Sequence, residues 1–133
     1  MSRPRVALSA LAAAVALPVT LALPSGPAAA ALPTKWTTYK DSSIDAGSDS
    51  GTITIKVGSN THKIAKIVIV VDCDGEKERF TRRNVTIKDN GRFSVSGGRY
   101  VSIEGKFWTE HRATGSITTN QCGFFGGDFS AKG

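Results

Sequence analysis

The sequence is poor in the residues from which most metal and redox sites are built. Its 133 residues include only two cysteines and two histidines. A disulfide-dense scaffold needs more cysteines than this, and two cysteines without a clustered histidine make a poor zinc site. His62 and His111 lie far apart in the chain, so they form no metal-binding motif. We therefore expect neither a metal centre nor another cofactor.

Motifs of the common hydrolases are also missing. The chain has no G-x-S-x-G nucleophile elbow, and neither His62 nor His111 lies in a catalytic motif. Serine and aspartate are plentiful, so a small secreted hydrolase that uses one of these histidines stays open as an alternative. A secreted protease inhibitor that presents a rigid loop is another. Because an isolated loop histidine is more often solvated than catalytic, we expect a protein that is not an enzyme.

A long apolar run occurs only near the N-terminus. Residues 6–23 are rich in Ala, Leu and Val, they follow Arg3 and Arg5, and three alanines at 28–30 offer a cleavage site. This pattern predicts a secretory signal peptide over residues 1–30. Prolines within and after the run argue against a membrane anchor. We expect a secreted, extracellular protein that does not span the membrane after cleavage and has no intracellular nucleic acid as a partner.

Charge is modest and slightly basic. After residue 30, fifteen Lys and Arg face eleven Asp and Glu, a formal charge of +4. A charge of +4 only weakly favours binding to an anionic surface. The need for a soluble protein explains this charge as well. A candidate basic patch is formed by Arg79, Arg82 and Arg83. The acidic run from Asp72 to Glu78 lacks the spacing of a calcium loop, and its capacity for weak calcium binding stays open.

Helical periodicity is absent after residue 30, where short alternating segments follow one another at about ten-residue spacing. We therefore predict an all-β domain over 51–133. It would be a small antiparallel β-sandwich of immunoglobulin-like architecture or a partly open barrel, with seven to eight strands. Residues 31–50 are expected to form a linker with a short strand. Trp36 and Tyr39 would attach that strand by filling the core.

Three hairpins are predicted from the side-chain faces. The alternating segment 51–57 should pair with the apolar run 66–73, which we expect to be buried on both faces. In the segment 85–96, a three-residue loop over 89–91 keeps the apolar residues on one face, with Gly91 left-handed. Residues 101–117 form the third hairpin.

That third hairpin has a definite expected register. A five-residue loop from Trp108 to Arg112 pairs Phe107 with Ala113 and sets Gly105 opposite Gly115. Two facing glycines leave a dent on the inner face, which a large side chain should fill. The candidates for this side chain are Phe124, Phe125 and Trp36.

Two cysteines in a secreted chain suggest one disulfide, between Cys73 and Cys122. The closed loop spans about 50 residues, for which the loop-entropy model predicts a stabilisation of roughly 4 kcal/mol. Two free thiols or a metal site are the alternatives.

The order of these features resembles a group of small secreted all-β proteins of actinobacteria and other bacteria. The shared pieces cover the chain from Gly51 to its end. They are Val71-Asp72-Cys73, Asn90-Gly91-Arg92-Phe93, Gly105-Lys106-Phe107, Ala113-Thr114-Gly115-Ser116-Ile117, Cys122 and Phe129-Ser130-Ala131. These are fold motifs, so the resemblance implies a fold and carries no site.

The candidate interaction site is the loop that contains Trp108, Glu110, His111 and Arg112. An aromatic ring beside charged groups at a loop tip can stack on a sugar or contact another protein. The alternative is that Trp108 folds back over the end of the domain. We therefore expect a non-catalytic binding module that acts outside the cell or at the cell envelope, with an extracellular protein or an envelope glycan as its partner.

Overall fold

The computed structural model describes residues 31–46, 49–96, 101–120 and 125–133. These residues form eight antiparallel strands and no helix. The signal peptide predicted over 1–30 lies outside the described residues. The strands are β1 (Thr38–Ala46), β2 (Asp49–Val57), β3 (Lys63–Cys73), β4 (Glu76–Thr86), β5 (Arg92–Val95), β6 (Val101–Thr109), β7 (Arg112–Thr119) and β8 (Phe125–Lys132).

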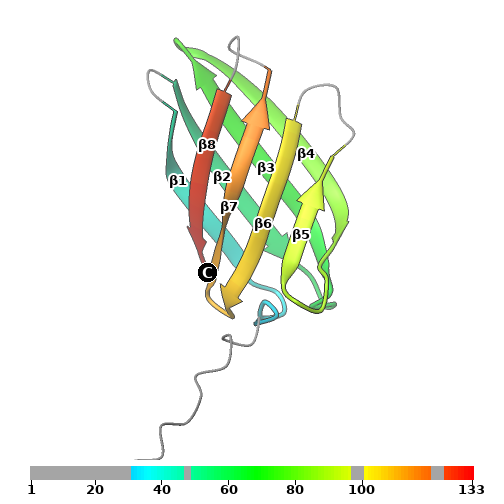
Figure 1. Cartoon of the computed structure of the whole chain (residues 1–133). Coiled ribbons are helices and arrows are strands. Elements are labelled where there is room, and N and C mark those ends of the chain that lie inside the picture. The colour runs from blue at the N-terminus through cyan, green and yellow to red at the C-terminus, as the bar shows by residue number, and fades with distance from the viewer. Residues whose placement is uncertain (1–30, 47–48, 97–100, 121–124) are drawn as a thin grey trace, which may run out of the picture.

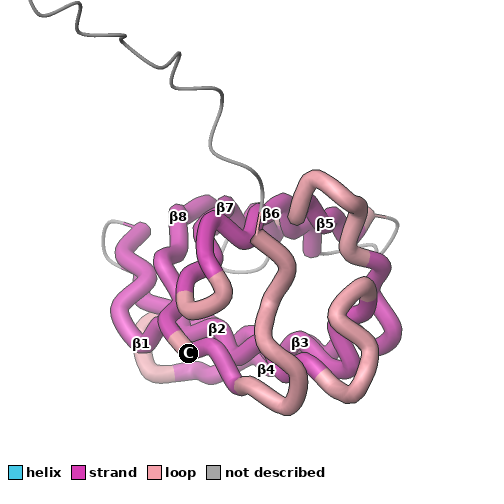
Figure 2. Tube along the Cα trace, turned by 90° about the horizontal axis from the view of Figure 1, so that it is seen from below, coloured by secondary structure: helices cyan, strands magenta, loops and turns pink. Residues whose placement is uncertain are grey.

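All eight strands belong to one sheet, in the order β4-β3-β2-β1-β8-β7-β6-β5. Two four-stranded meanders thus meet where β1 lies beside β8 (Figure 1). Seen from below, β1, β2 and β3 lie opposite β8, β7, β6 and β5 around a common interior (Figure 2). The sheet is a nearly closed barrel, so the barrel alternative is confirmed. The two separate sheets of an immunoglobulin-like sandwich are not formed, because β1 and β8 join the two halves.

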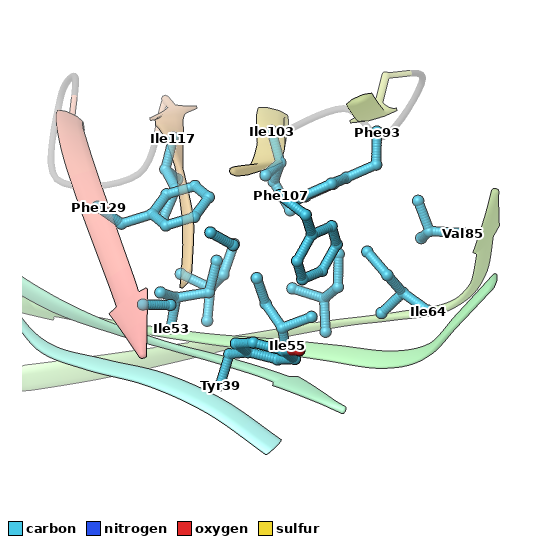
Figure 3. Close-up of a cluster of buried hydrophobic side chains, with 14 of the residues drawn as sticks. Tyr39, Ile53, Ile55, Ile64, Val85, Phe93, Ile103, Phe107, Ile117 and Phe129 are labelled. Carbon is cyan, nitrogen blue, oxygen red and sulfur yellow. The ribbon is translucent and has the colours of Figure 1, made fainter. Parts of the chain in front are cut away.

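The interior is filled by side chains that alternate along the strands. Ile53 and Ile55 of β2 are fully buried, and so are Ile103 and Phe107 of β6. Side chains from both halves meet in one cluster (Figure 3). Burying one such side chain contributes about 1.5–3 kcal/mol, so this cluster is the main source of stability. An eight-stranded barrel has an interior that side chains of this size can fill.

Strand β3 is buried on one face only. Ile67, Ile69 and Val71 are buried, whereas Val68 and Val70 on the other face are half-buried. The prediction that both faces are buried is wrong, because the barrel wall is one layer thick and no described element covers the outer face of β3. The predicted pairing of β2 with β3 is confirmed over the whole hairpin.

Two turns contain a glycine with positive φ. Asp74 and Gly75 link β3 to β4 with φ values of 53° and 93°, as two-residue Asp-Gly hairpins favour. Gly91 has φ 75°, and its N–H donates to the carbonyl of Lys88. The predicted loop over 89–91 is thereby confirmed.

The two described strands on either side of that loop, β4 and β5, do not pair with each other as a β-ladder. Among the described residues, β4 pairs with β3 and β5 pairs with β6, and no register joins β4 to β5. Asn84 has φ 56°, and the pairing of β4 with β3 is interrupted there. This irregularity lies directly after Arg82 and Arg83, which interrupt the apolar alternation between Phe80 and Val85. The gap between β4 and β5 is called the seam below.

The N-terminal strand is longer than expected. β1 and β2 extend through much of the segment predicted to be a linker, and β1 is a full member of the sheet. Tyr39 is fully buried, as predicted. Trp36 is 76% exposed, so its predicted core position is wrong. The backbone N–H of Trp36 donates to the carbonyl of Gly58. The indole ring of Trp36 lies outside the barrel.

Cys73 ends β3 and packs against the core cluster. Its predicted partner, Cys122, lies outside the described residues. The disulfide therefore stays a prediction.

Candidate functional site

The outer face of β5 to β8 carries an open hollow of about 450 Å³. Because side chains alternate along a strand, the residues between the core positions of β6, β7 and β8 point outward. We call this depression the outer hollow. It is lined by Arg92, Glu104, Gly105, Lys106, Trp108, Thr114, Gly115, Ser116, Asp128 and Phe129.

Two facing glycines line the outer hollow, at the place where the sequence predicts a dent in the wall. Gly105 of β6 faces Gly115 of β7, as predicted. A Cβ on Gly115 would lie 2.0 Å from the carbonyl oxygen of Glu104, and one on Gly105 would lie 2.3 Å from Phe93 Cζ. The backbone of β6 therefore approaches Gly115, and the Phe93 ring approaches Gly105, more closely than a residue with a side chain allows.

The inner side of this dent is filled by other residues than predicted. The ring of Phe93 occupies the space inside Gly105, and the ring of Phe129 lies inside Gly115. Of the predicted residues, Trp36 is exposed, and Phe124 and the side chain of Phe125 lie outside the described residues. Both rings come from directly paired strands, since Phe93 of β5 is the cross-strand partner of Gly105 and Phe129 of β8 is the partner of Gly115. The sequence reasoning had aligned neither β5 with β6 nor β8 with β7.

Trp108 lies along the outer hollow and is 49% exposed. Its Nε1–H donates to Thr114 Oγ1 at 2.7 Å, and Lys106 Nζ lies 3.9 Å from its ring centroid. The ladder shifts register between Phe107 and Thr109, so Trp108 occupies a bulge in β6. Its predicted place in a five-residue loop is wrong, because Thr109 pairs with Arg112 and leaves a two-residue turn. The ring is held by a hydrogen bond and a cation–π contact while much of it stays accessible.

That two-residue turn, Glu110-His111, is fixed through its backbone. The hydroxyl of Tyr39 donates to the carbonyl of Glu110, and the N–H of Gly133 donates to the carbonyl of His111 at 3.0 Å. The side chains of both turn residues are exposed. The predicted interaction loop is thus divided between this turn and the outer face of the sheet.

Arg112 belongs to the outer face together with Trp108. It follows the turn, is exposed, and its Nε donates to Ser130 Oγ of β8 at 3.3 Å. The sequence reasoning missed Lys106 and Thr114 as partners of Trp108. The predicted register of β6 and β7 already placed these two opposite each other, and outward alternation was the signal that could have identified them.

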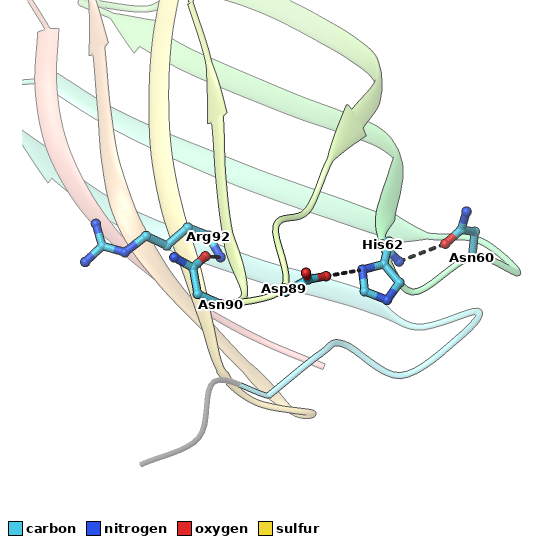
Figure 4. A network of polar contacts seen from close by, with 5 residues as sticks. All are labelled: Asn60, His62, Asp89, Asn90 and Arg92. Carbon is cyan, nitrogen blue, oxygen red and sulfur yellow. Dashed lines mark hydrogen bonds and ion pairs between the residues drawn. The ribbon is translucent and has the colours of Figure 1, made fainter. Parts of the chain in front are cut away.

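Neither histidine forms a catalytic constellation among the described residues. His62 Nδ1 lies 3.6 Å from Asp89 Oδ1 (Figure 4), and the exposed fractions of the two side chains are 49% and 101%. The backbone N–H of His62 donates to Asn60 Oδ1, which orders the turn between β2 and β3. No hydroxyl joins this pair, and the ring of His111 has no described hydrogen bond. A histidine-based hydrolase gains no support from this geometry.

The predicted basic patch is divided by the pleat of β4. Arg79 and Arg83 are exposed, while Arg82 is half-buried and pairs with the core residue Ile67. Arg82 and Arg83 nevertheless line a common hollow of about 380 Å³ at the seam. The remaining lining residues of this seam hollow are Asn84, Val85, Thr86, Lys88, Ser94, Val95 and Ser96.

The acidic run forms a turn. Asp72 Oδ1 accepts a hydrogen bond from the N–H of Gly75 at 2.8 Å, which stabilises the connection from β3 to β4. In the described part of the chain, no group of three or more His, Cys, Asp or Glu residues is placed to hold a metal ion.

Comparison of the chain with known proteins finds no matching family model, no matching curated protein and no matching solved structure. Among the described residues, no helix has the length and apolar character needed to cross a membrane.

Proposed function

We propose that this protein is a secreted, non-catalytic binding module that holds a glycan of the cell envelope in the outer hollow. The observation that carries the proposal is Trp108, whose half-exposed ring is fixed in a polar depression by Thr114 and Lys106. An exposed indole that is already oriented loses little conformational freedom when a ligand stacks on it.

The neighbours of Trp108 favour a sugar over a protein surface. Glu104, Ser116 and Asp128 lie in one row across β6, β7 and β8. Their carboxylate and hydroxyl oxygens can accept hydrogen bonds from sugar hydroxyls. Most of the other lining side chains are polar too, whereas the centre of a protein–protein interface is usually depleted of charge. An extracellular protein partner is therefore the less favoured occupant.

Two further features belong to this proposal. The N-terminal run supports export of the chain as a protein that begins near residue 31. A disulfide between Cys73 and Cys122 would tie the end of β3 to the segment between β7 and β8. Such a cross-link suits a small domain that must keep its shape outside the cell.

The test is binding of the protein to envelope polysaccharides, measured as a binding isotherm for the parent and two variants. Trp108→Ala should weaken binding by at least about tenfold, because it removes the stacking platform. Trp36→Ala is the matched control, since Trp36 is exposed and does not line the outer hollow. If folded Trp108→Ala binds as tightly as the parent, the outer hollow is not the site. Release of reducing ends that disappears in His111→Ala or His62→Ala would favour the hydrolase instead.

A further inference from the structure

Three hollows lie next to one another and share lining residues. A small hollow of about 170 Å³ lies between the seam hollow and the outer hollow. It shares Lys88 and Ser94 with the seam hollow, and it shares Arg92 and Glu104 with the outer hollow. Together they form one path from the edge of β4, over β5, to β8. We call this path the outer groove.

Positive charge prevails along the outer groove. Its lining includes two carboxylates, Glu104 and Asp128, and five cations. Among the described residues, no Lys or Arg lies within 4.0 Å of a carboxylate, so ion pairs do not neutralise these cations. The cations of the groove are Arg82, Arg83, Lys88, Arg92 and Lys106.

The two ends of the outer groove differ in chemistry. The seam hollow contains three cations, hydroxyl and amide groups, and no carboxylate. The outer hollow contains Trp108 and both carboxylates. Anionic groups are therefore favoured at the seam, and a sugar ring with free hydroxyls is favoured beside Trp108. Because neighbouring strands lie about 4.8 Å apart, the path from β5 to β8 alone covers about 14 Å, and the seam extends it. The groove is longer than one sugar ring.

We infer that the outer groove binds an extended anionic polysaccharide, with acidic groups at the seam and a sugar ring stacked on Trp108. This inference deepens the proposed function and rests on it. A single-stranded nucleic acid fits less well, because successive bases need a series of aromatic platforms. The described groove exposes one such ring, and its carboxylates would repel a densely charged backbone.

The test uses heparin and polygalacturonate oligosaccharides of increasing length, with neutral dextran as the uncharged probe. The seam variant is Arg83→Gln with Lys88→Gln, both exposed positions of the seam hollow. Its matched control is Lys40→Gln with Lys56→Gln, which removes the same charge from exposed positions of β1 and β2. Circular dichroism and thermal unfolding establish that each variant is folded. The single variant Lys88→Gln replaces the pair if the pair is unstable.

Affinity for long anionic chains should fall at least about tenfold between roughly 50 and 200 mM salt, since several cations contact the ligand. The seam variant should lower the affinity for long anionic chains at least about fivefold and change the affinity for disaccharides by no more than about twofold. Only a long chain reaches both ends of the outer groove. The control pair, Lys40→Gln with Lys56→Gln, should change the affinity for long chains and for disaccharides by no more than about twofold.

Three results would overturn the inference while leaving the proposed function intact. They are dextran binding as tight as that of the anionic chains, equal weakening by the control pair, and an equal effect of the seam variant on disaccharides and long chains. Tighter binding of single-stranded DNA than of any glycan would overturn both. The same holds if no glycan is bound in a manner that depends on Trp108.

Discussion

The carboxylate of Asp41 in β1 accepts a hydrogen bond from the backbone N–H of Ser130 in β8, with 2.7 Å between Oδ2 and N. The described ladder between these strands contains a single pair, Lys40 with Lys132. The other carboxylate oxygen, Oδ1, accepts from the N–H and the hydroxyl of Ser43. A side chain therefore strengthens the join between the two meanders where backbone pairing is sparse.

This carboxylate should make stability depend on pH. Partial burial acts to raise the pKa of Asp41, but the hydrogen bonds from Ser130 and Ser43 outweigh it and hold the pKa below its ordinary value of 3.8. A lowered pKa in the folded state means that the contribution is complete above the unfolded-state value and is lost as the pH falls through the folded-state value. Asp41→Asn should lower the free energy of unfolding by about 1 kcal/mol at pH 7, since solvent screens a partly exposed group. Urea unfolding at pH 7 and near pH 3 measures both values.

The difference in the free energy of unfolding between the parent and Asp41→Asn should be smaller near pH 3 than at pH 7. Asp89→Asn is the control, because that carboxylate is fully exposed beside His62 and joins no strands. A gap of the same size at both pH values would show that the charge of Asp41 does not stabilise the join.

The two facing glycines should respond differently to alanine. Gly105→Ala places a Cβ against the tip of the Phe93 ring, which can turn aside, and should cost about 1–3 kcal/mol. Gly115→Ala places a Cβ against the carbonyl oxygen of Glu104 and should cost more, because backbone cannot move without disturbing the ladder. Thermal unfolding of the two variants gives the comparison.

Replacing the Phe93 ring distinguishes the side-chain contact at Gly105 from the backbone contact at Gly115. Phe93→Leu should recover part of the loss in Gly105→Ala and none of the loss in Gly115→Ala. Because the outer hollow lies over the same glycines, Gly115→Ala should also weaken ligand binding. Equal rescue of both variants would mean that the backbone contact at Gly115 is relieved by other movements.

How much the sequence can predict depends on the range of the contact. The pairing of Gly105 with Gly115 and of Phe107 with Ala113 follows from local alternation, and both pairs are present. The position of Phe129 inside Gly115 depends on the register between β7 and β8, in which these two residues pair. No periodic pattern in one strand encodes that alignment.

The same limit applies to the candidate site. Trp108 is exposed, but the bulge that moves it from the loop onto the sheet face depends on the turn at Glu110-His111. Arg82 was placed with its neighbours in one patch, whereas the pleat of β4 sets it on the face of Ile67. Trp108 and Arg82 line one groove only because β5 lies beside β6. The amino-acid sequence of short strands does not specify that neighbour relationship.

Tyr39 should prove important for the end of the barrel that carries the Glu110-His111 turn. Its hydroxyl donates to the carbonyl of Glu110 and accepts from the N–H of Thr34 at 3.0 Å. Its ring meets Phe107 edge-on at 5.2 Å. Tyr39→Phe keeps the ring contact and leaves two backbone groups without this partner, so stability should fall by about 1–3 kcal/mol. Hydrogen exchange should accelerate at the turn before it accelerates in β2 and β3.

Alkaline titration provides a second measurement on Tyr39. Burial raises its pKa above the ordinary value, although hydrogen bonds with Thr34 oppose this. A raised folded-state pKa means that the contribution is complete below about pH 10 and is lost at higher pH. The parent should therefore lose stability above that pH faster than Tyr39→Phe does. Parallel curves would contradict a buried, neutral phenol.

The predicted cross-link can be tested by mass and by stability. If Cys73 and Cys122 are joined, the intact protein should be lighter than the reduced protein by two hydrogens and should not react with a thiol reagent. Replacing both by serine should cost roughly 4 kcal/mol, because the closed loop of about 50 residues no longer restricts the unfolded chain. Two thiols that react in the folded protein would contradict the cross-link.

Fluorescence can locate the ligand without removing the side chain that binds it. The chain has two tryptophans, so Trp36→Phe leaves Trp108 as the only indole. A stacked sugar should shift the emission of this variant to shorter wavelength and protect it from acrylamide, since it replaces water on a ring that is 49% exposed. Trp108→Phe leaves Trp36, which is 76% exposed and outside the outer hollow, and its emission should stay unchanged on addition of the same oligosaccharide. A response from Trp36 alone would move the binding surface to the N-terminal segment beside Gly58, where the backbone N–H of Trp36 is bound.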